Sequence, residues 1–162
     1  MILYHGGLVI VESPALAFSK GKHDFGSGFY LTSSLEQAIK WAKRNMRINN
    51  INQGFVSVFE FEDNSTLRRK EFIKPDLDWL QFVVDNRLRE CFNDEWDLVI
   101  GPVADDQAYN TIILYEDGLI DADFAIKKLL TEKLQDQYLF KTEVALNNLK
   151  FLKYIEVTKS II

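Results

Sequence analysis

The 162-residue sequence contains one cysteine, two histidines and three prolines, and no apolar run long enough to span a membrane. The single cysteine, Cys91, excludes an internal disulfide, and its amphipathic surroundings indicate a thiol in or near the core. Two histidines and one cysteine do not suggest a structural zinc site, so we expect no metal. The N-terminus lacks a basic segment followed by an apolar core, so a cytoplasmic protein without a membrane partner is expected.

The sequence also lacks an excess of positive charge, since 24 acidic and 19 basic residues give a formal net charge of -5. A domain that mainly binds phosphate backbones needs a basic face, which this balance disfavours. We interpret the local basic runs at residues 40–47 and 68–70 as solvated faces of a helix or loop. With 47% apolar residues and no long Pro-, Gly- or Ser-rich tract, residues 1–162 are predicted to form a single domain.

The order of the predicted elements favours an α+β fold. Strands are predicted at residues 2–6, 28–32, 55–61, 96–104, 136–142 and 151–157 from β-branched and aromatic content. Helices are predicted from the capping-box residue Ser34 to Arg47, from Asp76 to Cys91, in a helical insert at residues 105–134 that breaks at Asp117-Gly118, and briefly at 143–149. Strands and helices do not alternate as βαβ units, so a doubly wound sheet is disfavoured.

Three short stretches carry residues suited to binding a planar ligand. His5 ends the first strand before two glycines, whose missing Cβ atoms let backbone groups approach a ligand closely. Tyr30 follows a glycine-punctuated loop, where its ring is placed to stack on a heteroaromatic group, and Gln137 opens a late aromatic strand. The ordinary alternatives are a half-buried strand histidine, a packed aromatic and a common strand-entry glutamine.

Tyr-His-Gly, then Gly-x-Gly-Phe-Tyr before a capped helix, then a polar residue opening an aromatic C-terminal strand together resemble the ADP-ribosyltransferase superfamily. The likeness is closest to the branch with a His-Tyr-Glu signature, which includes poly(ADP-ribose) polymerases and the diphtheria toxin type. The sequence is also similar to a bacterial ADP-ribosyltransferase-like family of unknown function, often encoded in toxin–antitoxin-like arrangements. The resemblance implies a split antiparallel sheet core with flanking helices, and residues 105–134 fit it least.

The resemblance also implies a function and a set of site residues. NAD would be the co-substrate of a mono-ADP-ribosyltransferase with an unknown intracellular acceptor, and a small antitoxin protein would be a partner. His5 would hydrogen-bond the adenosine ribose, the Gly6 backbone would clamp the nicotinamide carboxamide, and Tyr30 would stack on the nicotinamide ring. Ala38 and Trp41 would close the other side of the pocket, and Trp41 is equally compatible with plain core.

Gln137 departs from the family pattern, in which a glutamate opens this strand. Glutamine still accepts a hydrogen bond, but it lacks the charge that stabilises an oxocarbenium ion, a loss on the order of a hundredfold in rate. Glu143 is the second candidate for the catalytic acid, its alternative being a helix-terminal carboxylate beside a threonine N-cap. Asp136 is expected on the opposite strand face, and Asp105-Asp106 is either a ligand-binding pair or a helix cap.

Two alternatives to a transferase follow from the missing glutamate. The first is a catalytically weak or inactive module that binds NAD or ADP-ribose, which the uncharged Gln137 favours. The second is an unrelated α+β structural domain in which His5 and Tyr30 are merely packed. Every hypothesis that involves a ligand requires the His5 imidazole, the Tyr30 ring and the Gln137 amide to meet in one cleft.

Overall fold

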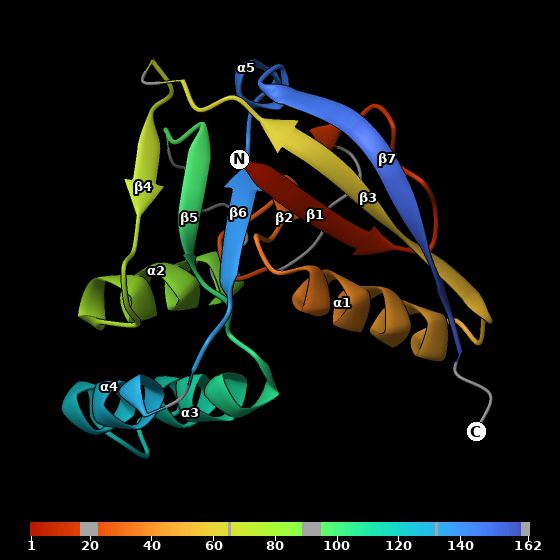
Figure 1. The fold of residues 1–162 in the computed structure, drawn as a ribbon. Helices are drawn as coiled ribbons and strands as arrows, with labels where there is room; N and C mark the ends of the chain where they lie inside the picture. Colours follow the sequence, from red (N-terminus) through yellow and green to blue (C-terminus); the bar gives the residue numbers. More distant parts are fainter. Residues whose placement is uncertain (17–22, 65, 89–94, 132, 160–162) are drawn as a thin grey trace.

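The computed structural model describes residues 1–16, 23–64, 66–88, 95–131 and 133–159 (Figure 1). Its strands are β1 (Ile2–Gly7), β2 (Phe29–Leu31), β3 (Gln53–Phe61), β4 (Arg69–Glu71), β5 (Leu98–Pro102), β6 (Asp136–Phe140) and β7 (Leu149–Thr158). Its helices are α1 (Leu35–Ile48), α2 (Leu77–Leu88), α3 (Asp106–Glu116), α4 (Ala122–Leu130) and α5 (Glu143–Leu146). The predicted α+β class is therefore confirmed.

The strands form two separate sheets whose edges meet. The first has the order β1-β3-β7 and is antiparallel throughout, whereas the second has the order β2-β6-β5-β4, with only β4 and β5 parallel. Among the described residues, one isolated bridge joins the sheets: the backbones of Tyr4 and Thr32 exchange hydrogen bonds of 2.8 and 3.0 Å. This bridge places β1 beside β2 and thereby brings His5 next to Tyr30.

Apolar side chains fill three layers around the sheets. One layer lies between α1 and the first sheet, where Ala42 and Val56 are fully buried. A second lies between the sheets, where the rings of Phe29 and Phe59 meet edge to face at 5.8 Å. The third joins Leu139 of β6 to α2, α3 and α4, which Figure 1 shows grouped together, apart from α1.

Helix α1 packs unusually close to β1. The Ser34 side chain caps the helix by accepting a hydrogen bond of 3.2 Å from the Gln37 backbone, as the capping-box pattern predicts. A Cβ atom on Gly6 would lie 1.9 Å from the carbonyl oxygen of Ala38. Only glycine therefore fits at residue 6, and this contact fixes α1 against the edge of the first sheet.

The structure differs from the sequence-based expectations at the basic run of residues 68–70. This run, predicted as a solvated face of a helix or loop, enters β4, where Arg69 and Lys70 are half-buried and pair in parallel with β5. The second helix, predicted from Asp76 to Cys91, is described as α2 up to Leu88, and Cys91 with its predicted core thiol lies outside the described residues. The insert forms α3 and α4 with a break at Gly118, which has a φ of +73°.

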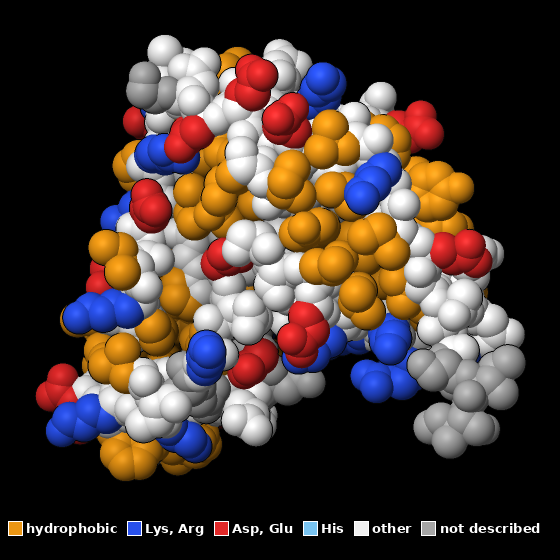
Figure 2. Space-filling model, viewed as in Figure 1, with side chains coloured by type: hydrophobic (Ala, Val, Ile, Leu, Met, Phe, Trp, Pro, Cys, Tyr) orange, Lys and Arg blue, Asp and Glu red, His pale blue; other side chains and the backbone are white. Residues whose placement is uncertain are grey.

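The surface of the first sheet carries exposed apolar side chains. Figure 2 shows hydrophobic side chains gathered where Figure 1 places β1, β3 and β7. The exposed apolar residues of these strands include Ile2, Leu152 and Tyr154. Most residues of β7 are exposed or half-buried, as expected of an edge strand. Among the described residues, no helix is both long and apolar enough to cross a membrane.

Candidate functional site

A cleft of about 620 Å³ lies where β1, β2, β6 and α1 approach one another. Its volume falls within the range of about 300–1,000 Å³ that is usual for ligand pockets. Five residues singled out from the sequence line it, namely His5, Gly6, Tyr30, Trp41 and Gln137. The structure therefore brings these distant positions together in one cavity.

His5 presents a neutral imidazole. Its Nδ1 atom lies 2.8 Å from the carbonyl oxygen of Tyr30, and because a carbonyl only accepts, Nδ1 carries the proton and Nε2 is an acceptor. Burial lowers the pKa of His5 below its ordinary value, against the opposing effect of this hydrogen bond. A Cβ atom on Gly7 would lie 3.5 Å from Nε2, so the glycine leaves this nitrogen uncovered by a neighbouring side chain.

Gly6 offers its peptide groups to the same cleft. Tyr4 directs its N–H and C=O groups to Thr32 across the junction of the two sheets. In an extended strand the peptide groups alternate in direction, so those of Gly6, two residues later, point to the same edge of β1. Because the bridge ends at Thr32, the Gly6 N–H and C=O groups face the cleft that Gly6 lines.

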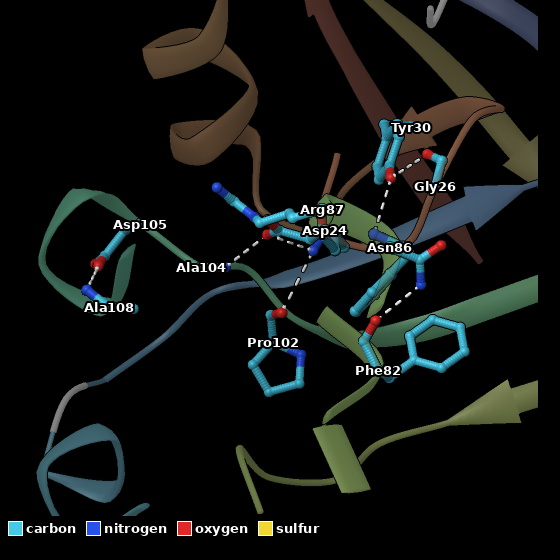
Figure 3. Close-up of polar contacts among 12 residues, drawn as sticks. Asp24, Gly26, Tyr30, Phe82, Asn86, Arg87, Pro102, Ala104, Asp105 and Ala108 are labelled. Atoms are coloured by element: carbon cyan, nitrogen blue, oxygen red, sulfur yellow. Dashed lines mark hydrogen bonds and ion pairs between the residues drawn. The ribbon is translucent and has the colours of Figure 1, made fainter. Parts of the chain in front are cut away.

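The ring of Tyr30 is held in place through its hydroxyl group. The hydroxyl donates to the Gly26 carbonyl oxygen at 2.6 Å and accepts from the Phe25 backbone N–H at 3.2 Å (Figure 3). The His23 ring lies 5.5 Å from the Tyr30 ring at a tilt of 56°. Since the hydroxyl is anchored to the preceding loop, the tyrosine contributes mainly the flank of its ring to the cleft.

Gln137 is 4% exposed, and its amide orientation follows from its neighbours. The Nε2 atom donates to Asp24 Oδ2 at 3.2 Å and more weakly to the Pro102 carbonyl oxygen at 3.4 Å. Both partners are acceptors, so the amide nitrogen must face them and Oε1 must point away. Gln137 therefore holds a buried carboxylate on one side and has an acceptor to offer on the other.

Sequence reasoning missed the ion pair at the back of the cleft. Asp24 is 6% exposed, and its carboxylate accepts hydrogen bonds from Arg87, from the Ala104 backbone N–H at 3.0 Å and from Gln137 (Figure 3). The Nε atom of Arg87 lies 2.8 Å from Asp24 Oδ1, and its guanidinium covers the ring of Tyr109. Asp24 directly precedes the glycine-rich loop, so its position next to the motif could have suggested a role in the site, whereas no sequence feature predicts one for Arg87.

Two predicted site residues lie outside the lining of the cleft. Ala38 is fully buried beneath Gly6, so it sets the distance between α1 and β1. Glu143 begins α5, beyond the end of β6 opposite Gln137 (Figure 1). The Thr142 side chain caps this helix, accepting from the Ala145 backbone at 3.2 Å, which matches the alternative interpretation of Glu143 as a helix-terminal carboxylate.

The remaining carboxylates singled out from the sequence have structural partners. Asp136 Oδ1 accepts from the Thr32 hydroxyl at 3.0 Å and the Ser33 backbone at 2.9 Å, on the strand face opposite Gln137, as expected. Asp105 caps α3 by accepting from the Ala108 backbone at 2.9 Å (Figure 3), and the Asp106 side chain is not among those described. Within the described ranges, no group of three His, Cys, Asp or Glu side chains is placed to hold a metal ion.

No curated protein matches this chain. One family model, described as a protein of unknown function (DUF3990), matches residues 1–151. The matched span contains every residue of the cleft, from His5 on β1 to Gln137 on β6. The family thus extends over both sheets up to the first residues of β7, and over all five helices. The chain belongs to the DUF3990 family.

Proposed function

We propose that the protein is an NAD-dependent mono-ADP-ribosyltransferase with an acceptor yet to be identified. The observation that carries the proposal is the convergence of His5, Tyr30 and Gln137 on one cleft, together with the Gly6 backbone. The arrangement of the fold supports it, because two antiparallel edges, β1 and β2, meet at the cleft with α1 behind them. This arrangement resembles the split-sheet core of the ADP-ribosyltransferase superfamily.

Each lining group has a function that suits NAD. The bound dinucleotide would supply an N-glycosidic bond whose leaving group is a positively charged nicotinamide ring. The flank of Tyr30 would stack on this ring, and the Gly6 N–H and C=O groups would pair with its carboxamide. The His5 Nε2 atom and the Gln137 Oε1 atom would accept hydrogen bonds from ribose hydroxyls, so the site would orient the ligand with few charges.

The charge at the back of the cleft favours slow catalysis. Asp24 brings a carboxylate to within one hydrogen bond of Gln137, but Arg87 pairs with it directly. A carboxylate neutralised by a guanidinium stabilises a developing cation far less than a lone glutamate does. This pairing favours, as the second candidate, a module that binds NAD or ADP-ribose with weak or no transfer.

Calorimetry with NAD tests the proposal directly. We expect wild-type protein to bind NAD and His5→Ala to bind it up to about tenfold more weakly, since one hydrogen bond is lost. Lys127→Ala on α4, an exposed position outside the cleft, should bind like wild type. Absence of binding to NAD, nicotinamide and ADP-ribose alike would overturn the proposal.

Nicotinamide release separates the two candidate functions. Release that is stimulated by a cell lysate and lost in His5→Ala and Tyr30→Ala would support a transferase. Binding without release under any condition would instead identify the binding module. Growth arrest on expression of the wild type, but not of His5→Ala, would support the further proposal that the protein is a toxin restrained by a small antitoxin.

A further inference from the structure

A second cleft, of about 420 Å³, adjoins the first along α1. Trp41 and Arg44 of α1 and residues 103–104 line both clefts, so the two lie side by side between the helix and this loop. The first cleft is lined by the face of α1 that carries Asn45 and Ile48, whereas the second is lined by the adjacent face of the same helix. The second cleft has no role in the function proposed above.

The second cleft is basic although the chain as a whole is acidic. Four cationic side chains at helical spacing line it, namely Lys40, Lys43, Arg44 and Arg47. All four are exposed, and Figure 2 shows blue side chains at the lower edge of the molecule, where Figure 1 places α1. Such a cluster in a concave site attracts anions.

Most of this positive charge is not neutralised by the protein. Lys40 pairs with the exposed Glu36 at 2.9 Å. Within the described part of the chain, Lys43, Arg44 and Arg47 make no ion pair. The one carboxylate among the described lining residues is Asp105, which is already engaged as the cap of α3. The cleft therefore has cations to offer to a bound phosphate.

Trp41 gives the same cleft an aromatic surface. The indole is half-buried and lies on α1 between the cationic face and the first cleft. Cations that bind phosphate next to an aromatic ring that stacks on a base are the combination used to bind single-stranded nucleic acids and nucleotides. Neither a bare carboxylate nor a lipid tail would make use of both features.

We propose that this second cleft binds a nucleotide unit, either free or at the end of a single strand. Its phosphate would lie against Lys43 and Arg47, and its base would lie against Trp41. The proposal does not depend on NAD binding, because the site can be assayed without NAD. It does place a second ligand directly beside the cleft proposed for NAD.

Fluorescence anisotropy with a labelled oligothymidylate of about ten nucleotides, a length typical of what single-strand-binding domains cover, tests the proposal. The wild type should bind at low salt and weaken as salt increases, because bound counterions are released. Lys43→Glu/Arg47→Glu should lose at least about tenfold in affinity and show a smaller salt dependence. Lys127→Glu/Lys128→Glu, which makes the same charge change on α4, should bind like wild type.

Two further measurements make the result decisive. Trp41→Ala should weaken binding while Trp41→Phe retains most of it, since base stacking needs an aromatic ring. Competition by AMP would indicate a free nucleotide as the ligand, and its absence would indicate a strand. The proposal is wrong if neither probe binds, if both charge variants lose binding equally, or if Lys43→Glu/Arg47→Glu impairs NAD binding alone.

Discussion

Two buried aspartates, each paired with an arginine, occupy different regions of this protein. Asp97, next to β5, accepts hydrogen bonds from the Arg68 backbone and guanidinium at 2.9–3.1 Å and from the Thr142 hydroxyl at 2.9 Å. Asp24, next to β2, accepts them from Arg87, from a backbone N–H group and from the amide of Gln137. Both aspartates are 6% exposed, so each carboxylate is buried beside its arginine.

The surroundings of the two carboxylates differ. Asp97 connects the chain before β4, the start of β5 and the end of β6, and it lies outside both clefts. Asp24 connects α2, the loop after β5 and Gln137, and it lines the first cleft. We infer that the Asp97–Arg68 pair serves stability alone, whereas the Asp24–Arg87 pair would also affect a ligand bound in the first cleft.

Replacement of Asp97 should give the largest effect on stability. Asp97→Ala removes several hydrogen bonds at once, two of them from the Arg68 guanidinium, and should lower the free energy of unfolding by about 3 kcal/mol. The melting temperature should fall by about 6–12 °C. Urea denaturation should show this loss, and Asp63→Ala, which breaks the exposed pair with Arg69, should cost less than about 1 kcal/mol. Equal losses in the two variants would refute the assignment.

Gln137→Glu should give the next largest loss of stability, because it places a second carboxylate beside Asp24 in the first cleft. The new carboxylate would face that of Asp24 and the Pro102 carbonyl oxygen, and we expect a loss of about 2 kcal/mol at neutral pH. Asp24→Asn/Gln137→Glu should recover most of this loss, since the asparagine can donate to the new carboxylate. Denaturation of the single and double variants measures the coupling, and strictly additive losses would contradict the geometry.

Local signals predicted most of the fold. The cap at Ser34 and the β-branched and aromatic content of the strands are local features of the sequence, so the sequence alone locates most of the helices and strands. The division into two sheets was not accessible from residue patterns, because it depends on pairing between strands far apart in the chain, such as β1 with β3 and β2 with β6. The three-residue β4 was missed because it is too short to show alternation.

The candidate site was predictable to the extent that its residues lie in recognisable motifs. His5, Tyr30 and Gln137 line the first cleft as the motif pattern requires. The ion pair between Asp24 and Arg87 joins residues 63 positions apart, and a single sequence does not show such pairing. The basic stretch at residues 40–47 was interpreted as a solvated helix face, which it is, but the cleft it lines depends on residues 103–105.

Asp24→Asn should reduce stability less than the variants above, and it should also reduce the affinity for NAD. With its oxygen in the place of Oδ1 at Arg87, the asparagine puts its amide nitrogen in the place of Oδ2, where it faces both the Ala104 N–H group and the amide nitrogen of Gln137. Gln137 should then flip, turning its nitrogen toward the cleft and withdrawing the acceptor. We expect a loss of about 1 kcal/mol in stability and up to about tenfold in NAD affinity.

The matched variant decides whether this effect belongs to the cleft. Asp97→Asn lies outside both clefts and should leave NAD affinity unchanged by calorimetry, although it also weakens an aspartate–arginine pair. If both asparagine variants reduced NAD affinity equally, the loss would reflect general destabilisation. If neither did, Asp24 and Gln137 would have no contact with the ligand.

The smallest effect is expected in the acid dependence of stability, and it concerns Asp97. Hydrogen bonds from Arg68 lower the pKa of Asp97 from 3.8 to about 2 in the folded protein. Between about pH 5 and pH 2 the unfolded chain therefore binds more protons at this residue than the folded chain, so acid favours unfolding. The stability that this carboxylate supplies is present above the higher value and lost as pH falls toward the lower one.

Denaturation of wild type and Asp97→Asn across this pH range isolates that contribution. The other carboxylates are common to both proteins, so the difference between their pH profiles belongs to Asp97. The variant should start less stable at neutral pH and lose less on acidification, and the two profiles should converge toward pH 2. Parallel profiles would mean that Asp97 is not held ionised by Arg68. Asp97 could then no longer serve as the purely structural pair with which Asp24 is compared.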